Sequence, residues 1–216
     1  MSNGFDPVSL AVTLALLALL PTLAVVCTSF LKIAIVLSLL RNALGVQQIP
    51  PNLALYGIAL LVSAYIMAPV GQNIYEEVVA VPQASRSIDS TLQAASLGAE
   101  PLRDFLIKHS DREHREFFIQ TARELWSVKL ASKVRETDFM VLLPSFMLTE
   151  MTAAFKIGFL LFLPFVVIDL IVSNILLAMG MMMVSPVMIS MPLKLFLFVM
   201  LDGWTRLIRG LILTYQ

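Results

Sequence analysis

The sequence predicts an all-α, multi-pass membrane protein in which apolar helical hairpins flank a smaller, polar helical block. Hydrophobic residues make up 58% of the 216-residue chain and charged residues only 14%, whereas soluble domains usually carry about 25% charge. Of the 30 charged side chains, 20 lie between Gly71 and Asp138. We therefore expect three parts: an N-terminal apolar hairpin (residues 1–70), a polar helical domain (71–138) and a C-terminal apolar hairpin (139–216).

Four apolar segments approach or exceed the length needed to cross a bilayer, which is about 20 residues. They are Val8–Leu40, Leu53–Val70, Phe139–Val172 and Ile175–Leu201. At about 1.5 Å per residue the first and third are too long for one simple span, so part of each must tilt, break or leave the bilayer. Pro21 interrupts the first, and Pro144 and Pro164 interrupt the third. Because proline removes a backbone hydrogen bond, we expect kinked or discontinuous helices there.

The N-terminal hairpin is defined by its connection. Gly45 can end a helix, and Pro50 and Pro51 prevent the helix from continuing, which predicts a tight turn. No Lys or Arg precedes Lys32, so the basic region of a secretory signal peptide is missing and we expect the first segment to stay in the mature protein. The single cysteine, Cys27, has no partner for an intrachain disulfide.

The polar block begins with a weakly ordered stretch at residues 82–98 and continues with helical signals. Pro101 suits the first turn of one helix, and Ser110 with Glu113 fits a capping box for a second. The charges flanking the apolar segments place this block in the cytoplasm when counted plainly. Loops beyond about 60 residues cross membranes largely regardless of charge, however, so the topology stays open.

The C-terminal hairpin is joined by a methionine-rich loop. Between Leu170 and Pro192 there is no charged residue, and six of the twelve methionines fall between Met179 and Met191. Methionine is flexible and polarizable and adapts to irregular partners. These side chains either serve that adaptability or fill a lipid-level core.

Motifs for catalysis are missing from the sequence. His109 and His114 are five residues apart, without the spacing that places two metal ligands on one helix face, and we expect them to be solvated surface residues. There is no nucleophile elbow and no glycine-rich phosphate loop. We expect no enzyme activity, cofactor, metal or nucleic-acid partner.

Six ionisable residues lie inside the apolar segments, where each costs a few kcal/mol if it is unpaired at the bilayer centre. They are Lys32, Glu150, Lys156, Asp169, Lys194 and Asp202. One interpretation is a small ion-coupled transporter that uses Glu150, Lys156 and Asp169. The other is paired charges at helix and subunit interfaces, which the scattered acidic residues favour.

Two stretches of the sequence resemble the FliP/SctR family of type III export apparatus proteins. The first is Thr28–Gly45 with Gln48–Asn52, and the second is Met179–Lys194 followed by Val199–Trp204. The resemblance extends over nearly the whole chain. It is weakest at the N-terminus and in residues 82–98.

The resemblance implies a structural, pore-forming subunit of the export gate through which unfolded proteins cross the bacterial inner membrane. Members of the family form a helical ring of about five copies with SctS-like and SctT-like subunits and act with an SctU-like switch protein. It also implies a periplasmic middle block, against the charge count. The missing signal peptide favours the virulence-type injectisome branch over the flagellar export gate, which is the alternative.

Within this interpretation the methionines acquire a role. We expect a deformable pore gasket formed by Met179, Met181, Met182 and Met183. Gly180 and Pro186 should shape the loop that presents it.

Overall fold

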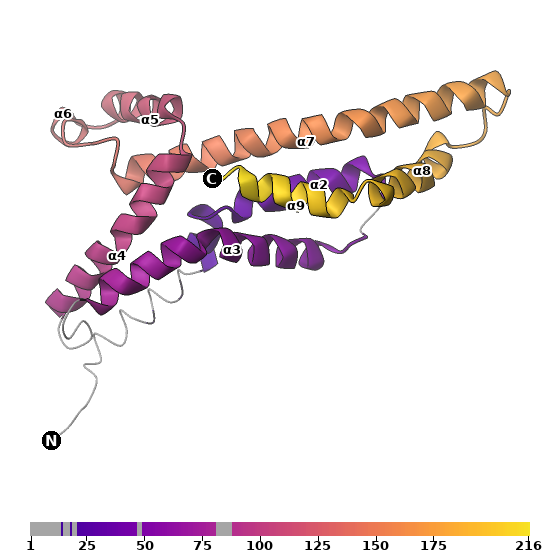
Figure 1. Ribbon diagram of the computed structural model, residues 1–216. Helices are drawn as coiled ribbons and strands as arrows, with labels where there is room; N and C mark the ends of the chain where they lie inside the picture. Colours follow the sequence, from indigo (N-terminus) through magenta and orange to yellow (C-terminus); the bar gives the residue numbers. More distant parts are fainter. Residues whose placement is uncertain (1–13, 15–17, 19–20, 47–48, 81–87) are drawn as a thin grey trace. The chain divides into compact units, whose positions relative to one another are not determined.

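The computed structural model describes residues 14, 18, 21–46, 49–80 and 88–216, the side chains of residues 88–94 excepted. In these ranges the chain is helical, without a strand (Figure 1). The helices are α2 (Phe30–Ala43), α3 (Asn52–Val79), α4 (Ile88–His109), α5 (Arg112–Leu125), α6 (Val128–Ala131), α7 (Phe139–Ala178), α8 (Pro186–Met200) and α9 (Gly203–Leu213). The all-α prediction is confirmed for this part of the chain.

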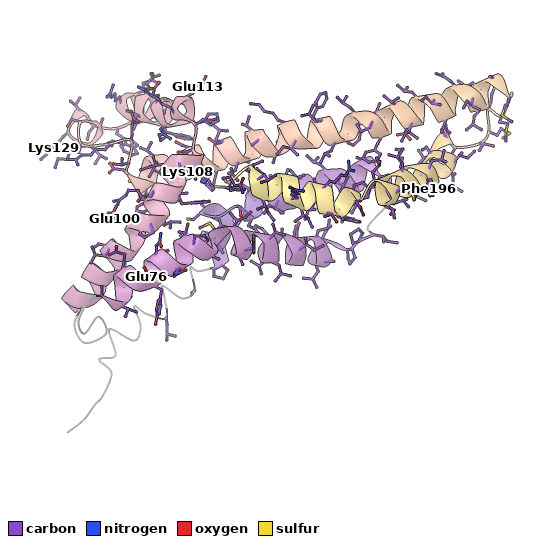
Figure 2. The ribbon with its side chains drawn as sticks, viewed as in Figure 1. Glu76, Glu100, Lys108, Glu113, Lys129 and Phe196 are labelled. Atoms are coloured by element: carbon purple, nitrogen blue, oxygen red, sulfur yellow. The ribbon has the colours of Figure 1, made fainter. Side chains whose placement is uncertain are left out.

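The chain forms two compact units, each made from two separate stretches of sequence. One unit contains the residues up to Ser29 together with Met67–Glu150, and the other contains Phe30–Ile66 and Met151–Gln216. Helices α3 and α7 contribute residues to both. Figure 2 labels charged side chains on α3 to α6, namely Glu76, Glu100, Lys108, Glu113 and Lys129, and the apolar Phe196 on α8.

Helix α2 lies at the centre of the second unit. It is apolar on most of its surface, and a helix that is hydrophobic all round is normally buried. Val36, Leu37 and Leu40 are buried against side chains of α3, α7, α8 and α9. The approach to α7 is close: a Cβ atom at Gly158 would lie 2.2 Å from Leu39 Cδ1. At 14 residues, α2 is too short to cross a bilayer by itself.

Helix α7 continues through both prolines that were expected to interrupt it. It runs unbroken for 40 residues past Pro144 and Pro164, so of the two expected outcomes, a kink or a break, the break is wrong. A proline deletes one intrahelical bond, and in long apolar helices the neighbouring groups compensate for that loss. Pro101 was predicted to lie in the first turn of a helix, but it lies well inside α4.

The methionine-rich loop joins the third and fourth apolar segments, as predicted. Helix α7 ends at Ala178 and α8 begins at Pro186, so only the apolar limit at Val172 falls short of the end of the helix. In the first segment, residues 21–26 are helical and the chain bends at Cys27–Ser29, after Pro21. The part of that segment before residue 21, including the proposed retained N-terminus, lies almost wholly outside the described residues.

Two of the described helices, α3 and α7, are long and apolar enough to cross a membrane. A third candidate arises if α8 and α9 count together, although they are bent by 64° at the break between them. Two or three candidate spans therefore lie among the described residues, and the four expected spans are not confirmed, because much of the first segment lies outside those residues.

The connection between α2 and α3 is the predicted tight hairpin. Helix α2 ends at Ala43, and Gly45 follows with a φ of 76° that glycine adopts without strain. Arg41 Nη1 donates to Asn52 Oδ1 at 2.6 Å and to the Pro50 carbonyl at 3.3 Å. The end of one helix is thus tied directly to the start of the next.

In the first unit, α4 packs closely on α3, where a Cβ atom at Gly98 would approach Val78 Cγ2 to 2.9 Å. Helix α5 begins after Asp111, and no side chain caps it, so the predicted capping box is wrong. The hydroxyl and carbonyl of Ser110 instead accept hydrogen bonds from Arg115. The Asp111 amide donates to Thr149 Oγ1 of α7 at 3.0 Å, which satisfies one of the free amides at the start of α5.

Candidate functional site

The turn between α7 and α8 is closed by local backbone hydrogen bonds. Gly180 has a φ of 74°, and its amide donates to the Leu177 carbonyl at 3.0 Å while the Met181 amide donates to the Leu176 carbonyl at 2.9 Å. These two bonds and a left-handed glycine form a Schellman motif, which satisfies the last carbonyls of a helix. At the other end, Pro186 occupies the first turn of α8 after Ser185, where its missing amide costs nothing.

The methionines of this turn are exposed. The exposed fractions are 66% for Met179, 39% for Met181, 81% for Met182 and 101% for Met183. They therefore do not fill the core of this chain. The turn presents thioethers and methyl groups, without a charged side chain among its neighbours in sequence.

A polar cluster holds the two arms of this hairpin together, with the Lys194 side chain buried and the Asp169 side chain partly exposed. Lys194 Nζ of α8 donates to Asp169 Oδ2 of α7 at 2.6 Å, and Ser190 Oγ donates to Asp169 Oδ1 at 2.6 Å. Lys194 Nζ also reaches the carbonyl of Ala43 at 3.2 Å. Because Ala43 is the last residue of α2, the ammonium group lies at the negative end of that helix. We call Asp169, Ser190, Lys194 and the Ala43 carbonyl the polar clamp.

Sequence reasoning singled out Asp169 and Lys194 but missed the other two members of the polar clamp. Ser190 is four residues before Lys194 and therefore lies on the same face of α8. This spacing was the sequence signal from which Ser190 could have been predicted. The Ala43 carbonyl carries no sequence signal, because every residue has one.

The other charges from the apolar segments have different surroundings. Lys32 is buried, with Nζ 3.7 Å from the centre of the Tyr215 ring, a cation–π contact that the sequence did not predict. Glu150 is buried and belongs to the other unit. Lys156 and Asp202 are exposed, so neither is a buried charge in this fold.

The two histidines were predicted to be solvated surface residues, but in the structure both make specific contacts. His114 Nδ1 lies 2.7 Å from Thr149 Oγ1. The His109 ring lies 4.7 Å from that of Phe105. The described residues contain no group of three or more His, Cys, Asp or Glu side chains arranged to hold a metal.

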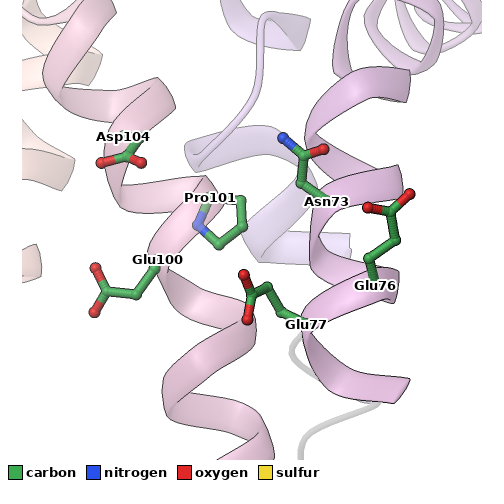
Figure 3. A pocket seen from close by; sticks show the side chains of 6 residues that line it. All are labelled: Asn73, Glu76, Glu77, Glu100, Pro101 and Asp104. Atoms are coloured by element: carbon green, nitrogen blue, oxygen red, sulfur yellow. The ribbon is translucent and has the colours of Figure 1, made fainter. Parts of the chain in front are cut away.

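Carboxylates gather around a cavity of about 340 Å³ in the first unit, between α3 and α4 (Figure 3). Glu76 and Glu77 come from α3, and Glu100 and Asp104 come from α4. Glu100 is already paired with Arg103. The cavity is open, and it gives the polar block a negatively charged face.

Together these features define a class: a helical membrane protein whose most unusual surface is an apolar turn rather than a catalytic cleft. The sequence model of the FliP family matches residues 13–211, and the chain therefore belongs to the FliP family.

Full-length relatives agree with this assignment. The chain is 50% identical over 210 residues to "Yop proteins translocation protein R" of Yersinia pestis, with 97% of each chain covered. It is 44% identical over 214 residues to "Harpin secretion protein HrcR" of Erwinia amylovora, with 99% of each covered. It is 42% identical over 221 residues to "Virulence protein YscR" of Salmonella typhimurium, with 100% of each covered. The family resemblance seen in the sequence is confirmed, and the family consists of structural components of type III secretion systems rather than enzymes.

Proposed function

We propose that this chain is a structural, pore-forming subunit of a type III secretion export gate, through which unfolded proteins cross the bacterial inner membrane. The observation that carries the proposal is the exposed, uncharged methionine turn at the end of the α7–α8 hairpin, in a chain that belongs to the FliP family. The names of the relatives refer to translocation, harpin secretion and virulence. These names favour an injectisome over a flagellar gate.

A gate for unfolded polypeptides must exclude water and ions yet yield to side chains of any size. Hydrophobic constrictions block ions by dewetting, and unbranched thioethers adapt to irregular partners. Met181, Met182 and Met183, supported by Met179, form the gasket of the proposed gate. Gly180 and Pro186 present it, because one ends α7 and the other starts α8.

The polar clamp serves the gasket by fixing the register of the hairpin. Asp169 lies nine residues before the end of α7, and Ser190 lies a few residues into α8. An ion pair with two further hydrogen bonds at that position limits sliding of one arm past the other. This role accounts for Asp169 without an ion-transport pathway, since its carboxylate is engaged by Lys194 and Ser190 rather than by Lys156.

The proposed gate contains several copies of this chain, about five by analogy with the family, together with SctS-like and SctT-like subunits and an SctU-like switch protein. The exposed Lys156 and Asp202 supply interface charges, whereas Lys32 and Glu150 are buried charges within the chain. The polar block of residues 71–138 faces the periplasm. The chain matches these relatives over nearly their whole length, which supports the proposal that it occupies the same place in the secretion apparatus as they do.

One experiment with two readouts tests the proposal. Native mass measurement of the complex purified in mild detergent should give a high-mass assembly with two other small membrane proteins. Replacing Met181, Met182 and Met183 together by Ala should leave that mass unchanged and make liposomes containing the complex leaky to small ions, because the constriction widens and becomes wet. A monomer or dimer that moves a solute would support a transporter instead. An assembled triple-Ala complex that neither leaks nor alters secretion would refute the gasket.

A further inference from the structure

The methionine turn has a second chemical property, which is the accessibility of its sulfur atoms. Met182 is 81% exposed and Met183 is fully exposed, whereas most core side chains of the second unit are below 10%. Both lie in a turn, so no helical neighbour covers them. In the single chain, a thioether in this setting is open to oxidants dissolved in water.

Building on the proposed function, we infer that Met182 and Met183, with Met181 beside them, are an oxidation site through which peroxides or hypohalous acids unseal the gate. In the step with a peroxide, a sulfur lone pair attacks the outer oxygen of the peroxide. With hydrogen peroxide, the S–O bond forms, the O–O bond breaks, and the leaving hydroxide departs as water after taking up the proton that the oxygen bound to sulfur gives up. The sulfur is oxidised by two electrons to the sulfoxide, and the peroxide is reduced by two.

The product changes the property on which the seal depends. Methionine sulfoxide is polar and chiral, and its oxygen accepts hydrogen bonds. A constriction that excludes ions by dewetting loses that barrier when its lining binds water. Each copy of the chain in a ring would contribute these sulfurs to the same constriction, so partial oxidation of every copy is enough to wet it. The closed gate then leaks.

The same chain provides controls. Met140, Met188 and Met200 are also exposed, but they project from helices α7 and α8 outside the turn. They should accept oxygen as the turn does, without consequence for the seal. The effect therefore depends on where the oxygen is added and not on the amount of oxidant consumed.

The test uses the whole export gate complex in liposomes loaded with an ion-sensitive dye and treated with hydrogen peroxide. Site-resolved mass spectrometry should show one added oxygen on each of Met182 and Met183, and ion flux should rise severalfold. Treatment with both methionine sulfoxide reductases, which together reduce the two epimers, should return the flux to its starting value. A complex with Met181, Met182 and Met183 replaced by Leu should show no rise on oxidation. A complex with Met140→Leu and Met188→Leu should respond like the unmodified one.

The outcomes separate this inference from the proposed function. If the turn is oxidised and flux stays constant while the triple-Ala complex leaks, the gasket stands and the oxidation switch is refuted. If neither oxidation nor triple-Ala replacement causes a leak, both are refuted. If the triple-Leu complex leaks as much as the unmodified one on oxidation, the leak arises elsewhere and the inference is again refuted. Should triple-Leu fail to assemble, Met182→Leu with Met183→Leu gives the same comparison with a smaller change.

Discussion

At the scale of single residues, the close contact between α2 and α7 depends on one glycine. A side chain at Gly158 would collide with Leu39, which lies within 3.3 Å of the Cβ position at three atoms. We predict that Gly158→Val lowers the free energy of unfolding of the purified chain by about 1–3 kcal/mol, the usual cost of overpacking. The measurement is the midpoint of unfolding in detergent.

Two further variants check the cause of that loss. Gly71→Val places the same side chain at a helical position with nothing within 4 Å, and its stability should change little. Leu39→Ala should recover part of the loss when combined with Gly158→Val, because it removes the colliding atoms. Equal losses in the Gly158 and Gly71 variants would show that the contact with Leu39 is unimportant.

At the scale of elements, the polar clamp links three helices through one buried ammonium group. Asp169→Asn removes the charge opposite Lys194, and we predict that the free energy of unfolding falls by about 1–3 kcal/mol, because the buried ammonium loses its charged partner while the Asp169 side chain is itself partly exposed. Replacing both partners, with Asp169→Asn and Lys194→Met, should cost less than the single change. Unfolding midpoints of the two variants and the unmodified chain make the comparison. A double variant that is less stable than the single one would mean that Lys194 contributes mainly through the Ala43 carbonyl.

The same scale shows which features could be predicted from sequence. The α2–α3 hairpin was predicted because Gly45 and Pro50 act locally, through backbone conformation and a missing donor. The expectation that Pro144 or Pro164 would break α7 was wrong for the complementary reason. Each proline was treated as a local defect, without regard to the long apolar helix on either side of it. The prediction of a capping box was wrong for a similar reason. Arg115 and Thr149 supply hydrogen bonds at the start of α5 in place of those that the local motif would have provided.

The candidate site also contains some features that the sequence could predict and others that it could not. Its methionines, Gly180 and Pro186 are contiguous and could be found from composition and turn signals alone. Tyr215 and the Ala43 carbonyl take part only because the fold brings them to Lys32 and Lys194. Contacts between residues more than a hundred positions apart leave no mark in one sequence.

At the scale of the whole molecule, the side of the membrane on which the polar block lies is the main testable consequence of the proposed function. Val128 of α6 is exposed, so a Val128→Cys variant in a Cys27→Ser background offers one accessible thiol. We predict that an impermeant thiol reagent labels it in intact spheroplasts, because the proposed topology places the block in the periplasm. Labelling that requires lysis would place the block in the cytoplasm, as the plain count of charges indicated.

The Schellman motif at Gly180 has a consequence for the polypeptide that would move past it. The amides of Gly180 and Met181 and the carbonyls of Leu176 and Leu177 are already joined to each other. An unfolded chain carries open peptide groups that add readily to any unpaired strand edge they meet. The turn offers little of that kind, so a chain in transit would touch mostly sulfur and hydrocarbon and would slide with low friction whatever its sequence.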